Sequence, residues 1–130
     1  MSVSRVLVVE DQDNVLVSII AILSALGYDA QGVKDPAEAK RAFVASKFDL
    51  VLTDINLGEG PDGVRLANDL LTHAPGQPII LMSGFKTPVA HHAQGFVYID
   101  KPFTPRELVE AIEIAMRIRD LSHVNRSERA

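Results

Sequence analysis

The chain of 130 residues contains no cysteine. Disulfide bridges, thiol catalysis and thiolate metal sites are therefore excluded. Positive charge is also scarce, because 13 Lys and Arg side chains stand against 17 Asp and Glu, which gives a net charge of −4. A nucleic-acid surface usually needs clustered basic side chains, and this balance argues against one. We expect no nucleic-acid partner.

Long hydrophobic runs are missing as well. The most hydrophobic stretch, residues 15–26, falls short of the roughly 20 residues that a helix needs to cross a bilayer. The first residues lead directly into a strand-like segment that ends in acids, which is not typical of a secretory signal. With 47% hydrophobic and 23% charged residues, the chain has the composition of one globular domain. We expect a cytoplasmic protein with no membrane association.

Strand-like segments alternate with helix-like segments along the whole chain. Strands are predicted at residues 5–9, 28–33, 49–53, 78–82 and 96–99. Helices are predicted at residues 14–26, 36–46, 64–74 and 87–94, and a fifth begins after Thr104. Because the strands are mostly continuous apolar runs, they predict a parallel sheet that is covered on both faces. Right-handed crossovers make such an α/β fold doubly wound.

Two of the predicted helices begin at clear capping signals. Asp35 and Thr104 are each followed by a proline, and Glu38 and Glu107 stand three residues after these caps. A capping residue, a proline at the first helical position and a glutamate in the first turn together indicate a helix N-terminus. The starts of the helices near residues 36 and 105 are therefore well determined.

Polar side chains with related chemistry follow several predicted strands. Glu10 and Asp11 end the first strand, Asp54 the third and Ser83 the fourth, and Lys101 follows the fifth. In doubly wound sheets, ligands bind beyond the carboxyl ends of the strands. Three carboxylates held close together repel one another, so the cluster needs a cation or retained protons. Oxygen ligands without His or Cys suit Mg²⁺, which also recruits phosphate oxygens.

A simpler alternative exists for the first acidic pair. Glu10 and Asp11 precede a predicted helix, and acids are favourable at helix N-termini without any metal. For one acid this explanation is sufficient, but it does not account for Asp54 and Lys101 at the same edge of the sheet. The complete set favours a site for a divalent cation and a phosphoryl group.

Taken together, the motifs resemble the receiver domain of two-component response regulators. They are the pair Glu10-Asp11, the strand-terminal Asp54, the Asp62-Gly63 turn, Ser83 and Lys101-Pro102-Phe103. The resemblance covers about residues 4–121 and leaves residues 122–130 as a polar C-terminal tail. It implies a flavodoxin-like five-stranded parallel sheet in the order 2-1-3-4-5 with five helices. The fourth helix, at residues 87–94, is expected to be shortened, because residues 84–97 must supply two loops as well as this helix and include Pro88 and Gly95.

The resemblance also implies a role for each site residue. Asp54 would be the phosphoacceptor, and Lys101 would pair with the phosphoryl oxygens. The implied Mg²⁺ ligands are the carboxylates of Glu10, Asp11 and Asp54 and the backbone carbonyl of Asn56. The peptide bond between Lys101 and Pro102 would be cis.

Two residues resemble the conformational switch of the family. Ser83 would donate its hydroxyl to the new phosphoryl group, and Tyr98 would turn inward in the active state. The plainer alternatives are that Ser83 caps a turn and that Tyr98 packs on the sheet edge.

The implied partner is a histidine kinase or a histidine phosphotransfer protein. The helix at 14–26 is apolar nearly all round, whereas a helix that covers a sheet needs only an apolar stripe. In the family this surface docks a four-helix phosphotransfer domain, although complete burial or a homodimer would also explain it. The shortened fourth helix weakens a common dimerisation face, so we expect a monomer or a weak dimer.

The predicted function is that of a single-domain response regulator, or of a receiver module without its own output. It signals through protein contacts and catalyses only its own phosphorylation and dephosphorylation. One alternative is a small-molecule phosphatase or phosphotransferase with an aspartate nucleophile, but Asn56 stands where that class needs a second acid. The other is a receiver-like interaction module that is never phosphorylated, against which the complete acidic set argues. The sequence names neither the kinase nor the downstream target.

Overall fold

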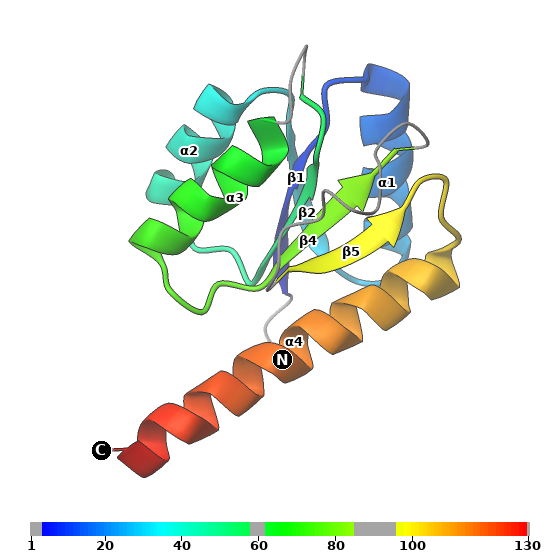
Figure 1. The fold of residues 1–130 in the computed structure, drawn as a ribbon. Helices are drawn as coiled ribbons and strands as arrows, with labels where there is room; N and C mark the ends of the chain where they lie inside the picture. Colours follow the sequence, from blue (N-terminus) through cyan, green and yellow to red (C-terminus); the bar gives the residue numbers. More distant parts are fainter. Residues whose placement is uncertain (1–3, 58–61, 85–95, 130) are drawn as a thin grey trace.

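The computed structural model describes the backbone of residues 4–57, 62–84 and 96–129. Five parallel strands form one sheet in the order β2-β1-β3-β4-β5 (Figure 1). The strands are β1 (Arg5–Val9), β2 (Asp29–Val33), β3 (Leu50–Asp54), β4 (Ile79–Ser83) and β5 (Val97–Asp100). The predicted flavodoxin-like doubly wound sheet and its strand order are confirmed.

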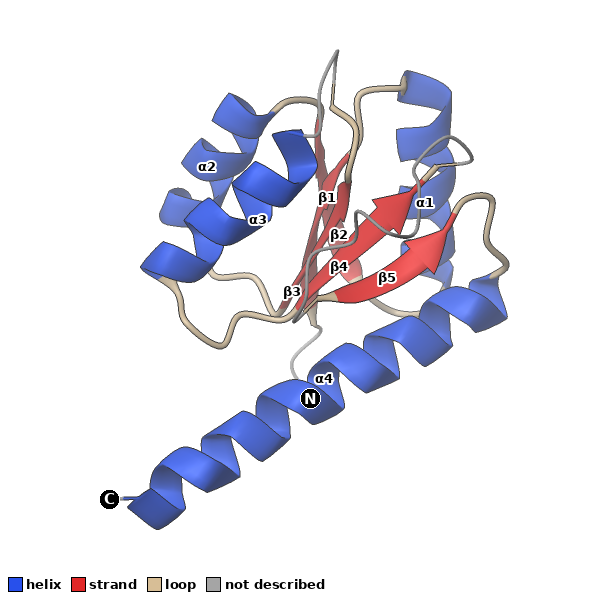
Figure 2. Cartoon of the chain, in the orientation of Figure 1, coloured by secondary structure: helices blue, strands red, loops and turns tan. Residues whose placement is uncertain are grey.

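Helices cover both faces of this sheet (Figure 2). They are α1 (Asp13–Ala25), α2 (Pro36–Ala45), α3 (Asp62–His73) and α4 (Pro105–Arg129). Helices α1 and α4 pack on one face, where Leu23 and Leu108 meet Val8 and Leu52. Helices α2 and α3 pack on the other face. The result is a three-layer α/β/α domain in which the carboxyl ends of all five strands lie at one edge of the sheet.

The continuous apolar strands are explained by burial on both faces. All five residues of β3 and of β4 are buried, since these strands have sheet neighbours and helices on every side. Strand β2 lies at the sheet edge, and most of its residues are at least partly exposed. Predicted strand positions agree with the observed ones to within one residue at each end.

The two predicted capping signals form the expected hydrogen bonds. The side chain of Asp35 accepts from the backbone N–H of Glu38 at 2.8 Å, at the start of α2. At the start of α4, Thr104 Oγ1 accepts from the N–H of Glu107 at 3.1 Å, and Glu107 Oε1 accepts from the N–H of Thr104 at 3.0 Å. This reciprocal pair is a complete capping box, which satisfies two backbone donors that the helix itself leaves unpaired.

The last helix continues further than the sequence indicates. Its backbone stays helical to Arg129, through most of the segment predicted to be a polar tail, and Figure 1 shows it projecting beyond the sheet. The helix predicted at residues 87–94 lies outside the described residues. Among the helices that the structure describes, none combines the length and the apolar character that a membrane crossing requires.

Candidate functional site

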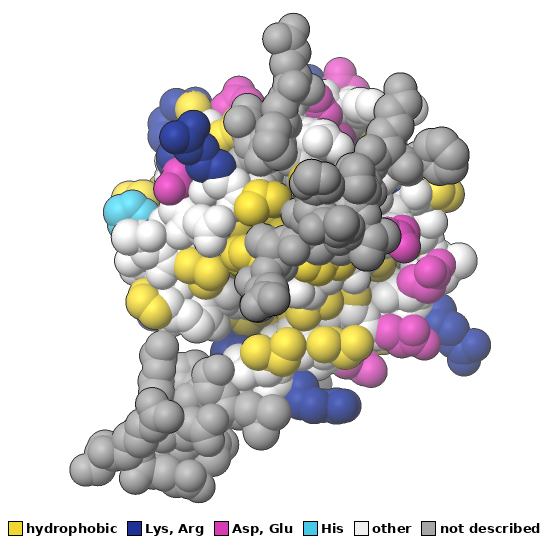
Figure 3. Space-filling model, viewed as in Figure 1, with side chains coloured by type: hydrophobic (Ala, Val, Ile, Leu, Met, Phe, Trp, Pro, Cys, Tyr) yellow, Lys and Arg dark blue, Asp and Glu magenta, His cyan; other side chains and the backbone are white. Residues whose placement is uncertain are grey.

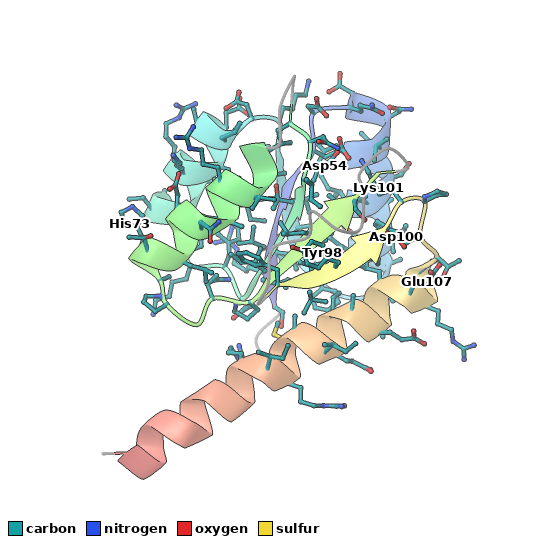
Figure 4. All side chains as sticks on the ribbon, viewed as in Figure 1. Asp54, His73, Tyr98, Asp100, Lys101 and Glu107 are labelled. Carbon is teal, nitrogen blue, oxygen red and sulfur yellow. The ribbon has the colours of Figure 1, made fainter. Side chains whose placement is uncertain are left out.

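The polar residues predicted at the strand ends converge at one edge of the sheet. Glu10 follows β1, Asp54 ends β3 and Lys101 follows β5, and Figure 4 shows Asp54 and Lys101 close together there. One carboxylate oxygen from each of Glu10, Asp11 and Asp54 lies within 4.8 Å of the other two. The parallel arrangement causes this convergence, because it brings the carboxyl ends of sequence-distant strands to the same edge.

Lys101 holds two of these acids with a single ammonium group. Its Nζ donates to Glu10 Oε1 at 2.7 Å and to Asp54 Oδ2 at 2.8 Å. Glu10 is fully buried and Asp54 is only 5% exposed, so water screens these ion pairs poorly. Glu10 also interacts with the start of the first helix, which is the simpler role considered for it from the sequence. Its Oε2 accepts from the backbone N–H of Gln12 just before α1. Glu10 therefore contacts both the helix start and the lysine.

Burial and neighbouring charges shift the pKa values of Glu10 and Lys101. Burial raises the pKa of the Glu10 carboxyl, and the hydrogen bond from Lys101 opposes this effect only in part. Burial by itself would lower the pKa of Lys101, but its hydrogen bonds to Asp54 and Glu10 outweigh that effect and raise it. Lys101 is thus a cation at neutral pH, fixed beside the carboxylate of Asp54.

The donor set fits a small hard cation. It consists of carboxylate oxygens from Glu10, Asp11 and Asp54, with no nitrogen or sulfur ligand among them. Asp11 is exposed, whereas the other two are buried, so the cluster opens to solvent on the Asp11 side. One or two carboxylates together with water are the usual protein ligands of Mg²⁺. This opening leaves room for waters and for a phosphoryl oxygen.

Backbone groups hold Asp54 in place. Its Oδ1 accepts from the backbone N–H of Asn56 at 3.1 Å, while its Oδ2 faces Lys101. The next residue, Ile55, continues the sheet by donating its N–H to the carbonyl of Met82 at 2.9 Å. Both oxygens of the Asp54 carboxylate therefore have fixed donors, which limits the rotation of the side chain.

Gly63 allows the backbone of α3 to approach this strand end closely. Its N–H donates to the Ile55 carbonyl at 2.9 Å. A Cβ at position 63 would overlap the carbonyl oxygen of Asp54 and lie 2.8 Å from Ile55 Cα, and these are backbone atoms that cannot rotate away. The Asp62-Gly63 motif thus has a steric explanation in the described structure.

We therefore expect Gly63→Ala to destabilise the protein by about 1–3 kcal/mol, the range for overpacking a tight site. Gly84→Ala is the matched control, because a Cβ there has no atom within 4 Å. Thermal denaturation of the two variants measures the difference. Equal melting temperatures for the two alanine variants would contradict the steric account.

The switch candidates occupy neighbouring strands. Ser83, at the end of β4, is 2% exposed and donates its Oγ–H to Asp100 Oδ1 at 2.7 Å. Tyr98 is partly buried and packs with the side chains on the α2 and α3 face of the sheet. The Lys101–Pro102 bond is cis, as predicted.

Sequence reasoning missed Asp100. It precedes Lys101 and was assigned no role, yet its carboxylate is the hydrogen-bond partner of Ser83. The sequence offered only their positions as a signal, because Ser83 and Asp100 directly follow the strands predicted at residues 78–82 and 96–99. If β4 and β5 pair in parallel register, their final residues are neighbours, and Ser83 does pair with Asp100.

A groove runs beside the acidic cluster. It lies between the first turns of α1 and the segment after β5, and its lining includes Val15, Ile19, Ile22, Lys101 and Phe103. Val17, on the same helix, is 66% exposed. At least one apolar side chain of α1 is therefore exposed to solvent.

A second apolar region lies on the side of the domain turned to the viewer. Figure 3 shows hydrophobic side chains gathered between α3 and α4, with charged side chains toward the periphery. On α4, Ile114 and Ile118 are about half exposed and stand one helical turn apart.

Comparison with known proteins relates this site to one family. Residues 6–113 match the family described as the response regulator receiver domain. The transcriptional regulatory protein RprY of Bacteroides fragilis is 32% identical over 118 residues, which are 87% of this chain and 49% of RprY. The regulatory protein AtoC of Escherichia coli is 27% identical over 124 residues, 92% of this chain and 27% of AtoC. The chain spans about half or less of the length of these relatives.

Solved structures show the same fold. A CheY-like response regulator receiver domain protein from Methanospirillum hungatei has a TM-score of 0.79 at 27% identity, and the match covers 93% of this chain and 99% of that one. NtrX from Brucella abortus has a TM-score of 0.84 at 27% identity, over 97% of this chain and 29% of NtrX. The match over residues 6–113 together with the shared fold establishes that this chain belongs to the receiver domain family of two-component response regulators.

Proposed function

We propose that this chain accepts a phosphoryl group on Asp54 from the phosphohistidine of a histidine kinase or histidine phosphotransfer protein. The observation that supports this most directly is the lysine shared by two acids. Lys101 bridges buried Glu10 and Asp54 at 2.7 and 2.8 Å, in a domain of the receiver family. A cation fixed beside a carboxylate nucleophile is the arrangement that phosphoryl transfer requires.

The transfer is an in-line displacement at phosphorus. One carboxylate oxygen of Asp54 attacks, a P–O bond forms, and the P–N bond to the donor histidine breaks. The departing imidazole nitrogen keeps the electron pair and takes up a proton. Lys101 is already next to Asp54 Oδ2, so it neutralises charge on the phosphoryl oxygens without moving far. Attack by water on phosphorus later restores the free carboxylate.

The proposed Mg²⁺ ligands are Glu10, Asp11, Asp54 and the backbone carbonyl of Asn56, and the acidic cluster supports the first three. A bound ion would neutralise charge on the phosphoryl oxygens and so reduce their repulsion of the attacking carboxylate. Glu10 also keeps Lys101 oriented through its 2.7 Å hydrogen bond.

Signalling then depends on charge. A phosphorylated Asp54 attracts the hydroxyl of Ser83, and we propose that Tyr98, which packs on the α2 and α3 face of the sheet, then turns inward.

The groove between α1 and the segment after β5 lies beside Lys101 and is the proposed docking surface for the phosphodonor. The apolar pair Ile114 and Ile118 is compatible with the proposed weak self-association, since the exposed area is small. The single-domain interpretation stays a prediction, because the curated relatives are longer than this chain.

A phosphodonor assay tests this function. We expect purified protein incubated with acetyl phosphate and Mg²⁺ to gain one phosphoryl group per chain that is labile to alkali and to hydroxylamine, as measured by intact-mass spectrometry. EDTA should prevent the gain, and Asp11→Asn should raise the Mg²⁺ concentration needed for the half-maximal rate, because it removes a charged ligand. Rapid, repeated hydrolysis of phosphate esters would instead support a small-molecule phosphatase. No incorporation under any condition would support an interaction module that is not phosphorylated.

A further inference from the structure

The hydroxyl of Ser83 has a partner in the unphosphorylated structure. Ser83 is 2% exposed, and its Oγ–H donates to Asp100 Oδ1 at 2.7 Å. The two residues are register partners at the ends of β4 and β5, and the N–H of Lys101 donates to the Ser83 carbonyl at 2.9 Å. Backbone pairing thus fixes the two side chains next to each other.

Ser83 and Asp100 lie on the same face of the sheet as Tyr98, the proposed switch residue. Side chains alternate along a strand, so residues two apart point to the same face. Leu81 and Tyr98 are register partners that pack on the α2 and α3 face, and Ser83 and Asp100 each stand two residues further on. Figure 4 shows Tyr98 and Asp100 along β5, with Lys101 just beyond. Asp100 is therefore the neighbour of Ser83 across the ladder and of Tyr98 along the strand.

A serine hydroxyl has one proton to donate. While Ser83 donates to Asp100, it cannot donate to a phosphoryl oxygen on Asp54. We propose that Asp100 is a positioning residue that holds the Ser83 hydroxyl in the resting state and competes with the phosphoryl group for it. This inference rests on the proposed function, in which Ser83 serves the phosphoryl group. The hydrogen bond to Asp100 would then set how much free energy the phosphoryl group must supply to draw the Ser83 hydroxyl toward Asp54.

Asp100 is well suited to be varied without loss of the fold. It is exposed, whereas its partner is buried, so a smaller side chain at position 100 leaves no buried cavity. Asp100→Ala removes the acceptor. Asp100→Asn keeps an acceptor oxygen of the same shape and removes the carboxylate.

The test measures binding of beryllium trifluoride with Mg²⁺, a phosphoryl mimic, by calorimetry on the full chain. We expect Asp100→Ala to bind about three- to tenfold tighter than the wild type, the change produced by removing one competing hydrogen bond. Asp100→Asn should lie between these two proteins. Ser83→Ala should bind more weakly than the wild type, and in that background Asp100→Ala should have no further effect, because no hydroxyl is left to compete for.

Each other outcome overturns the proposal in a recognisable way. Unchanged or weaker binding by Asp100→Ala, with normal wild-type binding and an unchanged melting temperature, shows that Asp100 does not hold the hydroxyl back. An equal gain with and without Ser83 shows that Asp100 acts by charge repulsion alone. If the wild type fails to bind the mimic, the proposed function fails and this inference fails with it.

Discussion

Asp54→Asn is expected to abolish the incorporation of phosphate from acetyl phosphate. The carboxamide is not a nucleophile, but it has nearly the same shape and keeps an oxygen that can accept from Lys101 or from the N–H of Asn56. The variant should therefore fold, and the loss should be chemical. Intact-mass spectrometry after incubation with the donor and Mg²⁺ measures it.

Asp49→Asn is the matched control for that substitution. Asp49 immediately precedes β3, at the opposite end of the strand from Asp54, and it is exposed. Its side chain accepts from the backbone N–H of Arg5 at 2.8 Å, a bond that an asparagine oxygen can also accept. This control should be phosphorylated as fast as the wild type. Phosphorylation of Asp54→Asn at a comparable level would show that the acceptor lies elsewhere.

Lys101→Ala is expected to slow phosphorylation by about 100-fold, the usual effect of removing one preorganised charge partner from a transition state. It also leaves the fully buried Glu10 without its cation. In buffer without Mg²⁺ we therefore expect a stability loss of about 3 kcal/mol, at the low end for breaking a buried pair because the site opens to solvent. Rates of incorporation and thermal melts measure the two effects.

Lys40→Ala provides the comparison for Lys101. Lys40 pairs with Asp69 at 2.9 Å, but both side chains are about half exposed. Exposed pairs contribute only about 0–1 kcal/mol, so this variant should melt close to the wild type and should be phosphorylated normally. If the two lysine variants behave alike, Lys101 is an ordinary surface lysine.

Much of the fold could be predicted because local signals agreed with one another. The capping residues Asp35 and Thr104 fixed the starts of two helices, and the buried strands β3 and β4 appear in the sequence as continuous apolar runs. Parallel pairing then determines that Glu10 and Asp54 meet at one edge. The strand order itself came from the resemblance to the receiver family, since periodicity does not order strands.

Other features depend on contacts that a linear pattern does not contain. The bond between Ser83 and Asp100 requires the register of β4 against β5, and a shift of one residue would separate them. Position 63 requires glycine because the start of α3 lies against the backbone of Asp54 and Ile55, and this close approach is visible only in the folded structure. The helical backbone of residues 122–129 was not predicted, because apolar side chains at helical spacing mark a helix in a sequence and this segment is mostly polar.

The central claim is that the carboxylate of Asp54 carries the phosphoryl group. Reductive trapping with borohydride converts an aspartyl phosphate to homoserine, which peptide mass spectrometry locates to a single position. We predict homoserine at position 54 in protein treated with acetyl phosphate and Mg²⁺, and none when EDTA is present. Homoserine at another aspartate, or a phosphoryl group located on a histidine or a serine, would contradict the account.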